Sequence, residues 1–413
     1  MKRIYHYFKS EAGNFFVING FTALSFSLII PILSLFLIEG LGFEPIYIGI
    51  YTVSYALAGI VVSQKFGAMA DRGVDSKKLF IISLIGMAMA ALSYAFLTQF
   101  WQILLAGTIF MGLARASVPM ILTMIRHFAD TYGLNAIKVN AQTRSSVSLI
   151  WIVGPPLAFL SVEQLGFQIN FLLATTLTLL VALYAWRKLP KADAALSQQK
   201  AQSRVVTVLP KTVIYLGITL FFGNVANANY ITAMPLYLTV ELNMPLSYPG
   251  LLLGLTAACE MPIMLIAAKW ANRFGSVRLL MFSFVVAMVF YVLCQLMVSI
   301  ETFLLIQLFN GLFFGIFIGI GISLLQNEAP NAIGKATAFY ANMMALGSMV
   351  GASLMGIVAQ YFGYKEALLL SFVAILIGFL MLLMFELSSK RHRGAEEVSE
   401  VSEVSEVSEV SGK

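Results

Sequence analysis

The sequence predicts an all-α membrane protein with twelve transmembrane helices in two pseudo-symmetric six-helix halves. Three observations support this fold class. The 413 residues are 59% hydrophobic and 11% charged, with a mean hydropathy of +0.86, whereas soluble domains are about a quarter charged. Apolar runs long enough to span a bilayer, about 20 residues each, follow one another along the chain. Finally, motifs of the first half recur in the second.

Twelve apolar runs predict the twelve helices. The first run follows basic residues, as a signal peptide would. It is about 25 residues long and lacks a small-residue cleavage site, so we expect it to remain as the first span. The expected spans are 13–38, 46–66, 78–98, 102–125, 140–162, 167–187, 212–240, 247–269, 278–299, 302–326, 336–361 and 365–387.

Basic and acidic residues alternate between successive connections. Lys and Arg occupy the N-terminus, the second connection, the central segment 188–211 and the segments after the eighth and last spans. The connections that alternate with these carry acidic residues, with Lys365 as the basic exception; the acidic residues are Glu39, Glu44, Glu163, Glu241 and Glu301. Because cytoplasmic connections are enriched in Lys and Arg, both termini and 188–211 are predicted to be cytoplasmic. The membrane is expected to be a bacterial inner membrane. The net charge of +6 thus indicates topology rather than nucleic-acid binding.

Few residues suggest enzymatic or metal chemistry. The three histidines, His6, His127 and His392, lie at or beyond the membrane edges, and both cysteines lie within spans. We therefore predict no enzyme, no cofactor, no metal site and no disulfide framework. The protein is expected to be a monomer in the lipid bilayer. The Val-Ser-Glu repeat in 389–413 predicts a disordered cytoplasmic tail, because it offers few large apolar groups to bury.

The two halves of the chain share motifs in the same order. Gly49 overlies Gly250 at an offset of 201, and Asp71-Arg72 overlies Asn272-Arg273 at the same offset. The segment 154–167 overlies 351–364 at an offset of 197. Halves 1–187 and 212–388, joined by the linker 188–211, match the parallel-repeat plan of major facilitator transporters.

The second connection resembles the loop signature of that superfamily, with Gly67, then Asp71-Arg72, then Lys77-Lys78. The resemblance implies a cytoplasmic latch in which Gly67, Asp71 and Arg72 act in gating. The segment 73–76 lacks the usual Gly-Arg step, which weakens the second half of the motif. The two lysines are interpreted as topology determinants.

Polar side chains are concentrated in particular spans. Spans three, six, nine and twelve lack amides and charges in their central turns, which suits lipid-facing helices. Amides facing inward, with aromatic rings nearby, suit a ligand rich in hydroxyl groups. The alternative is that each amide joins two helices, which contributes about 0.6 kcal/mol. The predicted substrate-binding residues are Tyr55, Trp151, Asn224, Asn227, Gln307, Asn310 and Asn342, and Tyr51 and Arg115 are further inward-facing candidates.

Glu260 lies in the middle of the eighth span. A charge at the centre of a bilayer costs about 2.5–3.5 kcal/mol on insertion scales. Its counterpart at the offset of 201 is Gly59, so the shared fold does not require a carboxylate there. Pro262 also interrupts the helix nearby, as in the broken helices of transport sites. We predict that Glu260 couples transport to protons, with Arg144 on span five as its cationic partner; the alternative is a helix-joining hydrogen bond.

Several stretches resemble the sugar efflux transporter family of the major facilitators. They are Arg144 with 148–159, the segment 229–237, the residues around Glu260, and 306–321. The resemblance implies export of sugars such as lactose, glucose or related glycosides by proton antiport. Ala233 replaces an aspartate common in such exporters, which puts a second acidic site in doubt.

A proton-coupled multidrug exporter on the same fold is the alternative function, and it would show a more apolar cavity. An importer is disfavoured by Gly154-Pro155-Pro156, which resembles an element of exporters. The arginine that such exporters carry on span four is replaced by Thr108, and Arg115 lies further along the same span.

Overall fold

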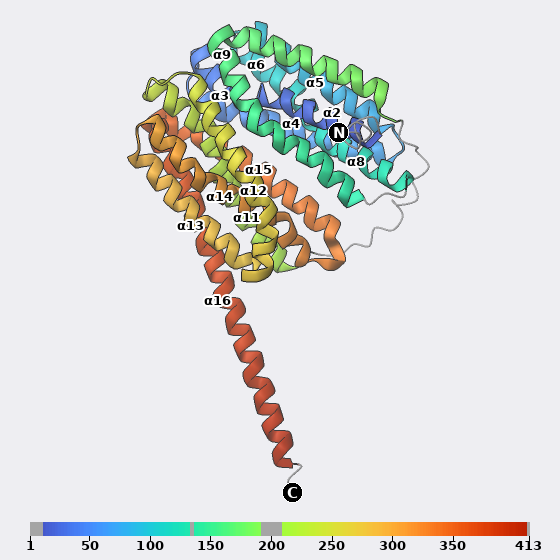
Figure 1. Ribbon diagram of the computed structural model, residues 1–413, viewed down its shortest axis with the longest axis vertical. Helices are drawn as coiled ribbons and strands as arrows, with labels where there is room; N and C mark the ends of the chain where they lie inside the picture. The colour runs from blue at the N-terminus through green and yellow to red at the C-terminus, as the bar shows by residue number, and fades with distance from the viewer. Residues whose placement is uncertain (1–10, 133–135, 191–208, 411–413) are drawn as a thin grey trace, which may run out of the picture.

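The computed structural model describes residues 11–132, 136–190 and 209–410, and the regular elements within these ranges are helical. Figure 1 shows two helical bundles side by side, the first in blue to green and the second in yellow to red. The first bundle contains α2 (Glu11–Ser27), α3 (Leu33–Leu35), η1 (Phe36–Gly40), α4 (Ile46–Asp71), α5 (Ser76–Phe96), α6 (Phe100–Ala106), η2 (Gly107–Met111), α7 (Gly112–Arg115), α8 (Ser117–Thr131) and α9 (Ala136–Lys188).

The second bundle repeats this plan. It contains α11 (Lys211–Leu236), η3 (Tyr237–Glu241), α12 (Ser247–Phe274), α13 (Ser276–Leu296), α14 (Ile300–Asn327), η4 (Pro330–Ala332), α15 (Ile333–Phe362) and α16 (Tyr364–Val410). The π-helices η1 and η3 lie 201 residues apart, the offset found in the sequence. Most of the linker 188–211 lies outside the described residues. So do the side chains of 389–413, and the expectations for both segments stay predictions.

The membrane crossings agree with the twelve predicted spans. By length and composition, the described ranges contain nine helices apolar enough to cross a membrane. One of them, Ser145–Lys188, reverses at Gly166 and so supplies two crossings. Gly166 has a φ of 82°, which only glycine adopts without strain. The first span (α2, α3 and η1) and the seventh (α11 and η3) complete the set.

Prolines explain two breaks within the spans. Pro31 has no N–H to donate to the carbonyl of Ser27, the residue at which α2 ends. Pro119 likewise leaves the carbonyl of Arg115 without a helical donor, and α7 ends at Arg115. The fourth span is therefore interrupted at Ala116, immediately after a charged residue in the middle of that span.

The two halves meet near one end of the bundle. Gly49 of α4 packs against Ser353 of α15, and a Cβ at Gly356 would lie 2.6 Å from the carbonyl oxygen of Pro45. The side chain of Gln360 accepts a hydrogen bond from the Ile46 amide and donates one to Glu44, both at 3.3 Å. On the other side of the molecule, α12 packs against α9. These contacts hold the halves together at the end that carries the acidic connections.

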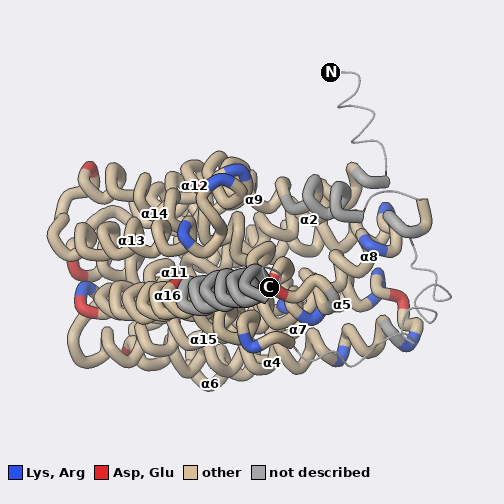
Figure 2. The backbone as a smooth tube through the Cα atoms, turned by 90° about the horizontal axis from the view of Figure 1, so that it is seen from below, with Lys and Arg blue, Asp and Glu red and all other residues tan. Residues whose placement is uncertain are grey.

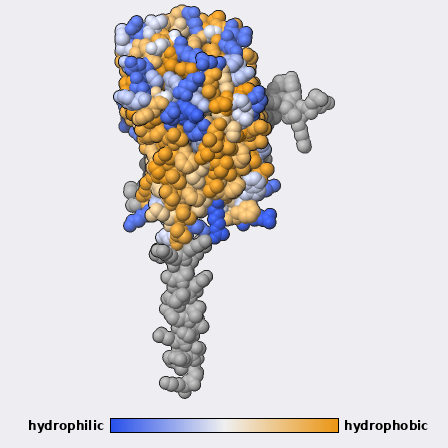
Figure 3. All heavy atoms as spheres, turned by 90° about the vertical axis from the view of Figure 1, so that its left-hand side faces the viewer, coloured by the Kyte–Doolittle hydropathy of each residue, from blue (hydrophilic) through white to orange (hydrophobic). Residues whose placement is uncertain are grey.

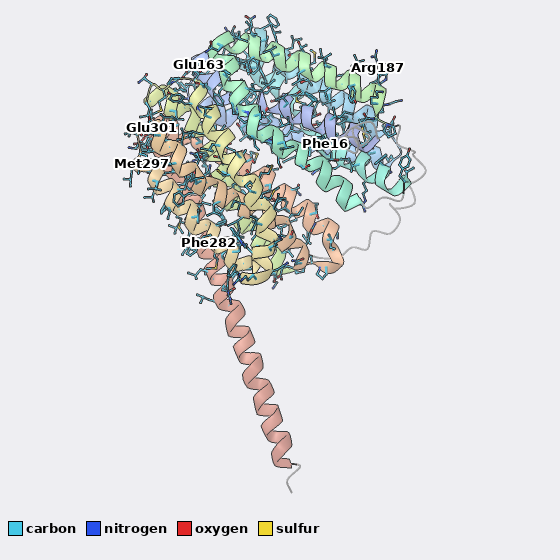
Figure 4. All side chains as sticks on the ribbon, viewed as in Figure 1. Phe16, Glu163, Arg187, Phe282, Met297 and Glu301 are labelled. Carbon is cyan, nitrogen blue, oxygen red and sulfur yellow. The ribbon has the colours of Figure 1, made fainter. Side chains whose placement is uncertain are left out.

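The surface has the character of a membrane protein. Exposed leucine, isoleucine, valine and phenylalanine side chains occur on nearly every span, and Figure 3 shows a broad hydrophobic face. In Figure 2 most of the backbone is tan, and red and blue segments are few. Glu163 and Glu301 lie at one end of the bundle and Arg187 at the other (Figure 4). The alternation read from the sequence thus corresponds to two opposite ends of the molecule.

Candidate functional site

A cavity of about 490 Å³ lies between the two halves. Its walls come from the first, second, fourth and fifth spans of the first half and from α11 and α15 of the second. The lining combines apolar side chains with hydroxyls, amides, aromatic rings and one guanidinium. The polar and aromatic members are Asn19, Thr22, Phe26, Ser34, Tyr51, Thr52, Tyr55, Arg115, Trp151, Asn227, Thr232 and Ser348.

A second cavity of about 330 Å³ adjoins the first and extends into the second half. Val147, Trp151, Asn227 and Ile231 line both cavities, so these residues mark where the two chambers meet. The second chamber adds residues of α12 and α14, including Thr256, Glu260 and Asn310. Among the described residues, none that lines either chamber belongs to α5, α13 or α16. This agrees with the expectation that the third, ninth and twelfth spans lie away from the pathway.

In the first chamber, aromatic residues and Arg115 form a contiguous cluster. The rings of Tyr51 and Tyr55 lie 5.2 Å apart, and the hydroxyl of Tyr51 is hydrogen-bonded to that of Tyr94. Gly107 is what lets Tyr51 fit, because a Cβ there would lie 2.3 Å from the tyrosine ring. The Arg115 guanidinium carbon lies 5.2 Å from the centroid of the Tyr55 ring, within cation–π range.

Beside the second chamber lies a buried hydrogen-bond network. Gln307 accepts hydrogen bonds from Tyr230 at 3.1 Å and from Thr256 at 2.7 Å. The Asn310 amide nitrogen lies 3.3 Å from the same Gln307 oxygen. Within the part of the chain that the structure describes, the amide oxygen of Asn310 has no hydrogen-bond partner, although the residue is only 1% exposed and lines the chamber. An unsatisfied buried acceptor costs about 1–3 kcal/mol, so a ligand hydroxyl would stabilise it.

Glu260 is half-buried at the wall of the second chamber. Its helix, α12, packs tightly on α14, since a Cβ at Gly315 would lie 2.8 Å from the Glu260 carbonyl oxygen. Its sequence counterpart Gly59 has a different use, because a Cβ there would lie 2.9 Å from Cβ of Arg115. Equivalent positions thus carry a carboxylate in one half and space for an arginine in the other.

The structure brings together several predicted substrate-binding residues. Tyr55, Trp151, Asn227 and Asn310 line the two chambers, and Gln307 lies behind Asn310.

Besides Gln307, two predicted substrate-binding residues lie outside the lining, Asn224 and Asn342. Asn224 points to α15, where its amide donates to Ser348 at 2.8 Å and to the carbonyl of Met344. Asn342 is exposed on α15 and is not among the residues that line either chamber. Its contact with substrate stays a prediction. The Arg144 side chain lies outside the described residues, so its pairing with Glu260 also stays a prediction.

The predicted latch residues lie where α4 ends. α4 ends at Asp71, whose side chain lies outside the described set, and Arg72 is exposed. Beyond the backbone of α4 itself, no described atom lies within 4 Å of where a Cβ at Gly67 would stand. Asp75, in the segment that departs from the motif, caps α5 by accepting a hydrogen bond from the Lys77 amide at 3.0 Å.

The cavity contains polar residues that the sequence reading passed over. Asn19 carried the same signal as the other amides, an amide within an apolar span. Thr22, Ser34, Thr232 and Thr256 carried no comparable signal, because hydroxyls within helices usually bond to their own backbone. Only the packing shows that these side chains face the chambers.

Comparison with known proteins agrees with this architecture. The model of the Major Facilitator Superfamily matches residues 15–225 and 216–411, which correspond to the two halves. Sugar efflux transporter A of Dickeya chrysanthemi is 31% identical over 370 residues, covering 88% of this chain and 92% of the relative. Sugar efflux transporter A of Escherichia coli is 29% identical over 342 residues, covering 81% and 86%.

Solved structures show the same fold at lower identity. The nucleoside transporter NupG superposes with a TM-score of 0.74 at 15% identity, covering 91% of this chain and 98% of its own. A bacterial homologue of the lysosomal transporter Spinster, solved in an inward-facing and occupied conformation, gives 0.70 at 13%, covering 90% and 95%. These similarities concern the fold alone. The sequence matches also show the family. This chain is a transporter of the Major Facilitator Superfamily and belongs to its sugar efflux transporter family.

Proposed function

We propose that the protein exports sugars, such as lactose, glucose or related glycosides, from the cytoplasm across the inner membrane by proton antiport. The observation that carries this proposal is the pair of adjoining chambers between the halves, lined by amides, hydroxyls and aromatic rings, with Glu260 at the wall. The relatives named as sugar efflux transporters support the substrate class.

Sugar binding follows from the chemistry of the lining. Trp151 and Asn227 stand where the two chambers meet. An indole ring packs on the apolar face of a sugar ring, and an amide both donates to and accepts from hydroxyls. The Asn310 oxygen offers a further acceptor in the second chamber. A glycoside with one group in each chamber would satisfy these partners together.

Proton coupling is assigned to Glu260. A carboxyl group in a membrane-embedded cavity can bind a proton when the cavity faces one side and release it on the other. Export then requires that sugar and proton occupy the site in alternation. Arg144 is retained as the proposed cationic partner that favours the charged form.

Alternating access is proposed to follow from the arrangement of the halves. The inter-half contacts at Gly49, Gly356 and Gln360 lie at the end that carries the acidic connections. If basic connections mark the cytoplasm, this conformation faces inward. We expect a compartment-sensitive reporter in the connection at Glu241 to report the periplasm, and one at the C-terminus to report the cytoplasm. A cytoplasmic signal at Glu241 would exclude this topology.

The decisive experiment uses everted membrane vesicles and a panel of labelled sugars. An acid-inside pH gradient should drive a substrate sugar into the lumen. Glu260→Gln keeps the shape and hydrogen-bonding capacity of the side chain but cannot carry the proton. It should abolish accumulation while exchange of labelled for unlabelled sugar at equal pH persists. Glu301→Gln, at the end of α14, serves as the matched control and should accumulate sugar normally.

Two outcomes would overturn the assignment. Gradient-driven accumulation by Glu260→Gln would show that another group couples the proton. Transport of cationic dyes by the wild type, with no movement of any sugar, would favour the multidrug exporter instead.

A further inference from the structure

Arg115 occupies an unusual position within the fourth span, Phe100–Phe128. It is the last residue of α7, next to the interruption of the helix at Ala116. The stem of its side chain lies against Gly59 of α4, where a Cβ would come within 2.8 Å of Cγ. The guanidinium donates to the Tyr55 hydroxyl at 3.5 Å and lies over the Tyr55 ring. The fold thus provides space for a cation at the wall of the first chamber.

This cation has no carboxylate partner among the residues that the structure describes. Of the described residues, Arg115 is the one Lys or Arg that lines the 490 Å³ chamber, and neither Asp nor Glu is among them. The ion pair found between described residues joins Arg278 to Glu386, on α13 and α16. A cation within the membrane is costly unless water or an anion compensates it. Its ring partner and a long hydrogen bond leave most of its five N–H donors for a ligand.

We propose that the first chamber is a subsite for a monoanionic sugar acid, a sugar ring bearing a carboxylate, and that Arg115 binds that carboxylate. This proposal rests on the proposed function and narrows its substrate class. A guanidinium presents two parallel N–H groups that match the two oxygens of a carboxylate. One guanidinium balances one negative charge. A phosphate, with nearly two charges at neutral pH, would leave an excess in this chamber.

A second unpartnered group faces the same chamber. The Thr22 hydroxyl has no hydrogen-bond partner among the described residues, although Thr22 is only 5% exposed and lines the cavity. Asn19 and Tyr51 line the cavity as well. The hydroxyls of the sugar ring would meet Thr22 and Asn19 while the carboxylate meets Arg115. The neutral partners alone would still hold an uncharged sugar, but more weakly.

The test compares two ligands that differ in one group, phenyl-β-D-glucuronide and phenyl-β-D-glucoside. Binding of each to the purified protein in detergent is measured by titration calorimetry at neutral pH. Charge-assisted hydrogen bonds predict that the glucuronide binds roughly 10- to 100-fold more tightly than the glucoside. Arg115→Gln should abolish this preference, and Arg115→Lys should retain part of it. Arg126→Gln, an exposed arginine on α8, is the matched control and should keep the full preference.

Each outcome decides a separate point. Equal or weaker binding of the glucuronide by the wild type would overturn this proposal and leave sugar export intact. If Arg115→Gln still binds the glucuronide more tightly than the glucoside by the wild-type factor, the carboxylate is bound by a group other than Arg115, and the proposal is wrong. Tighter binding of glucose 6-phosphate than of the glucuronide would show that the subsite binds a sugar phosphate rather than a sugar carboxylate. Should Arg115→Gln not fold, the comparison of wild type with Arg115→Lys still decides. Failure of both glycosides to bind would count against the proposed function itself.

Discussion

At the scale of single residues, Asn224 and Asn227 show that helical spacing alone does not tell which of two amides faces the cavity. The two amides lie one turn apart on α11, and both are buried. Asn224 meets Ser348 and Met344 of α15, whereas Asn227 lines both chambers. Helical periodicity places them on similar faces, but which amide meets a neighbouring helix depends on how α15 packs. The sequence predicted both as substrate-binding residues and did not distinguish the amide that joins two helices from the amide that lines the cavity.

Their alanine variants should therefore behave differently. Asn224→Ala removes hydrogen bonds between two helices, and we expect a loss of about 1–3 kcal/mol in the free energy of unfolding. Asn227→Ala should leave stability nearly unchanged and weaken sugar binding several-fold, because it removes a ligand contact. Thermal unfolding in detergent and the KM of sugar exchange at equal pH measure the two effects. A lower melting temperature in Asn227→Ala with unchanged KM would reverse the assignment.

Gln307 is another predicted substrate-binding amide that lies behind the lining rather than in it. Its side chain is fully buried, accepts from Tyr230 and Thr256, and donates to the Phe303 carbonyl at 3.1 Å. It orients Asn310, which lines the chamber. For Gln307 and Asn310, the amide within the span indicated a position at or next to the chamber. Which of the two lines the chamber depends on the surrounding side chains.

At the scale of elements, the spans and their breaks follow from local chemistry. Apolar length predicts each crossing, and Pro31 and Pro119 stand four residues beyond the carbonyls at which α2 and α7 end. Pro156 has a further consequence, because it leaves the Ile152 carbonyl without a helical donor. That carbonyl packs against Gly254 of α12 in the other half. The π-helices η1 and η3 had no comparable signal, because their extra residue per turn reflects packing rather than composition.

Gly254 should accordingly control how tightly the halves close at this end. A Cβ there would lie 2.6 Å from Cγ of Pro156 and 2.7 Å from the Ile152 oxygen. We expect Gly254→Ala to cost about 1–3 kcal/mol in the closed contact and so to increase the population open at this end. In a background with both native cysteines replaced by serine, Ile231→Cys supplies a reporter in the cavity. Its labelling by an impermeant maleimide from outside whole cells should rise.

The matched control for this prediction is Gly311→Ala. A Cβ at Gly311 would lie 2.4 Å from Cβ of Cys259 in the native chain, but that contact joins α14 to α12 within one half. It should lower stability without increasing external labelling. Equal labelling in both variants would show that Gly254 does not report on the contact between the halves.

At the scale of the whole molecule, the two halves share one backbone plan, but they carry different charged residues at the chambers. The offset of 201 relates η1 to η3, and the offset of 197 relates Gly166 to Gly363, both with positive φ. The sequence predicted this plan because backbone geometry constrains glycine and proline in each half alike. The site departs from it, with Arg115 in one chamber and Glu260 in the other. That asymmetry could be read from the charges, whereas the shape of the chambers required the packing.

The proposed latch at the end of α4 acts through the whole molecule, because it would form or break only when one half moves relative to the other. The inter-half contacts at Gly49, Gly356 and Gln360 lie at the opposite end from Asp71. We therefore expect Asp71 to contribute in the other conformation. Asp71→Asn should shift the population towards the state described here. A shift of about 1.4 kcal/mol would slow transport about tenfold, while the melting temperature stays near that of the wild type.

Asp75→Ala provides the contrasting variant, since Asp75 caps α5 by accepting from the Lys77 amide. Loss of a helix N-cap costs about 1 kcal/mol, so this variant should lower stability in both conformations alike. Transport rate in vesicles, thermal unfolding and maleimide labelling at Ile231→Cys together separate the two effects. External labelling should fall in Asp71→Asn and remain unchanged in Asp75→Ala. Normal transport by Asp71→Asn would mean that this carboxylate takes no part in closing the end of the bundle at which α4 ends.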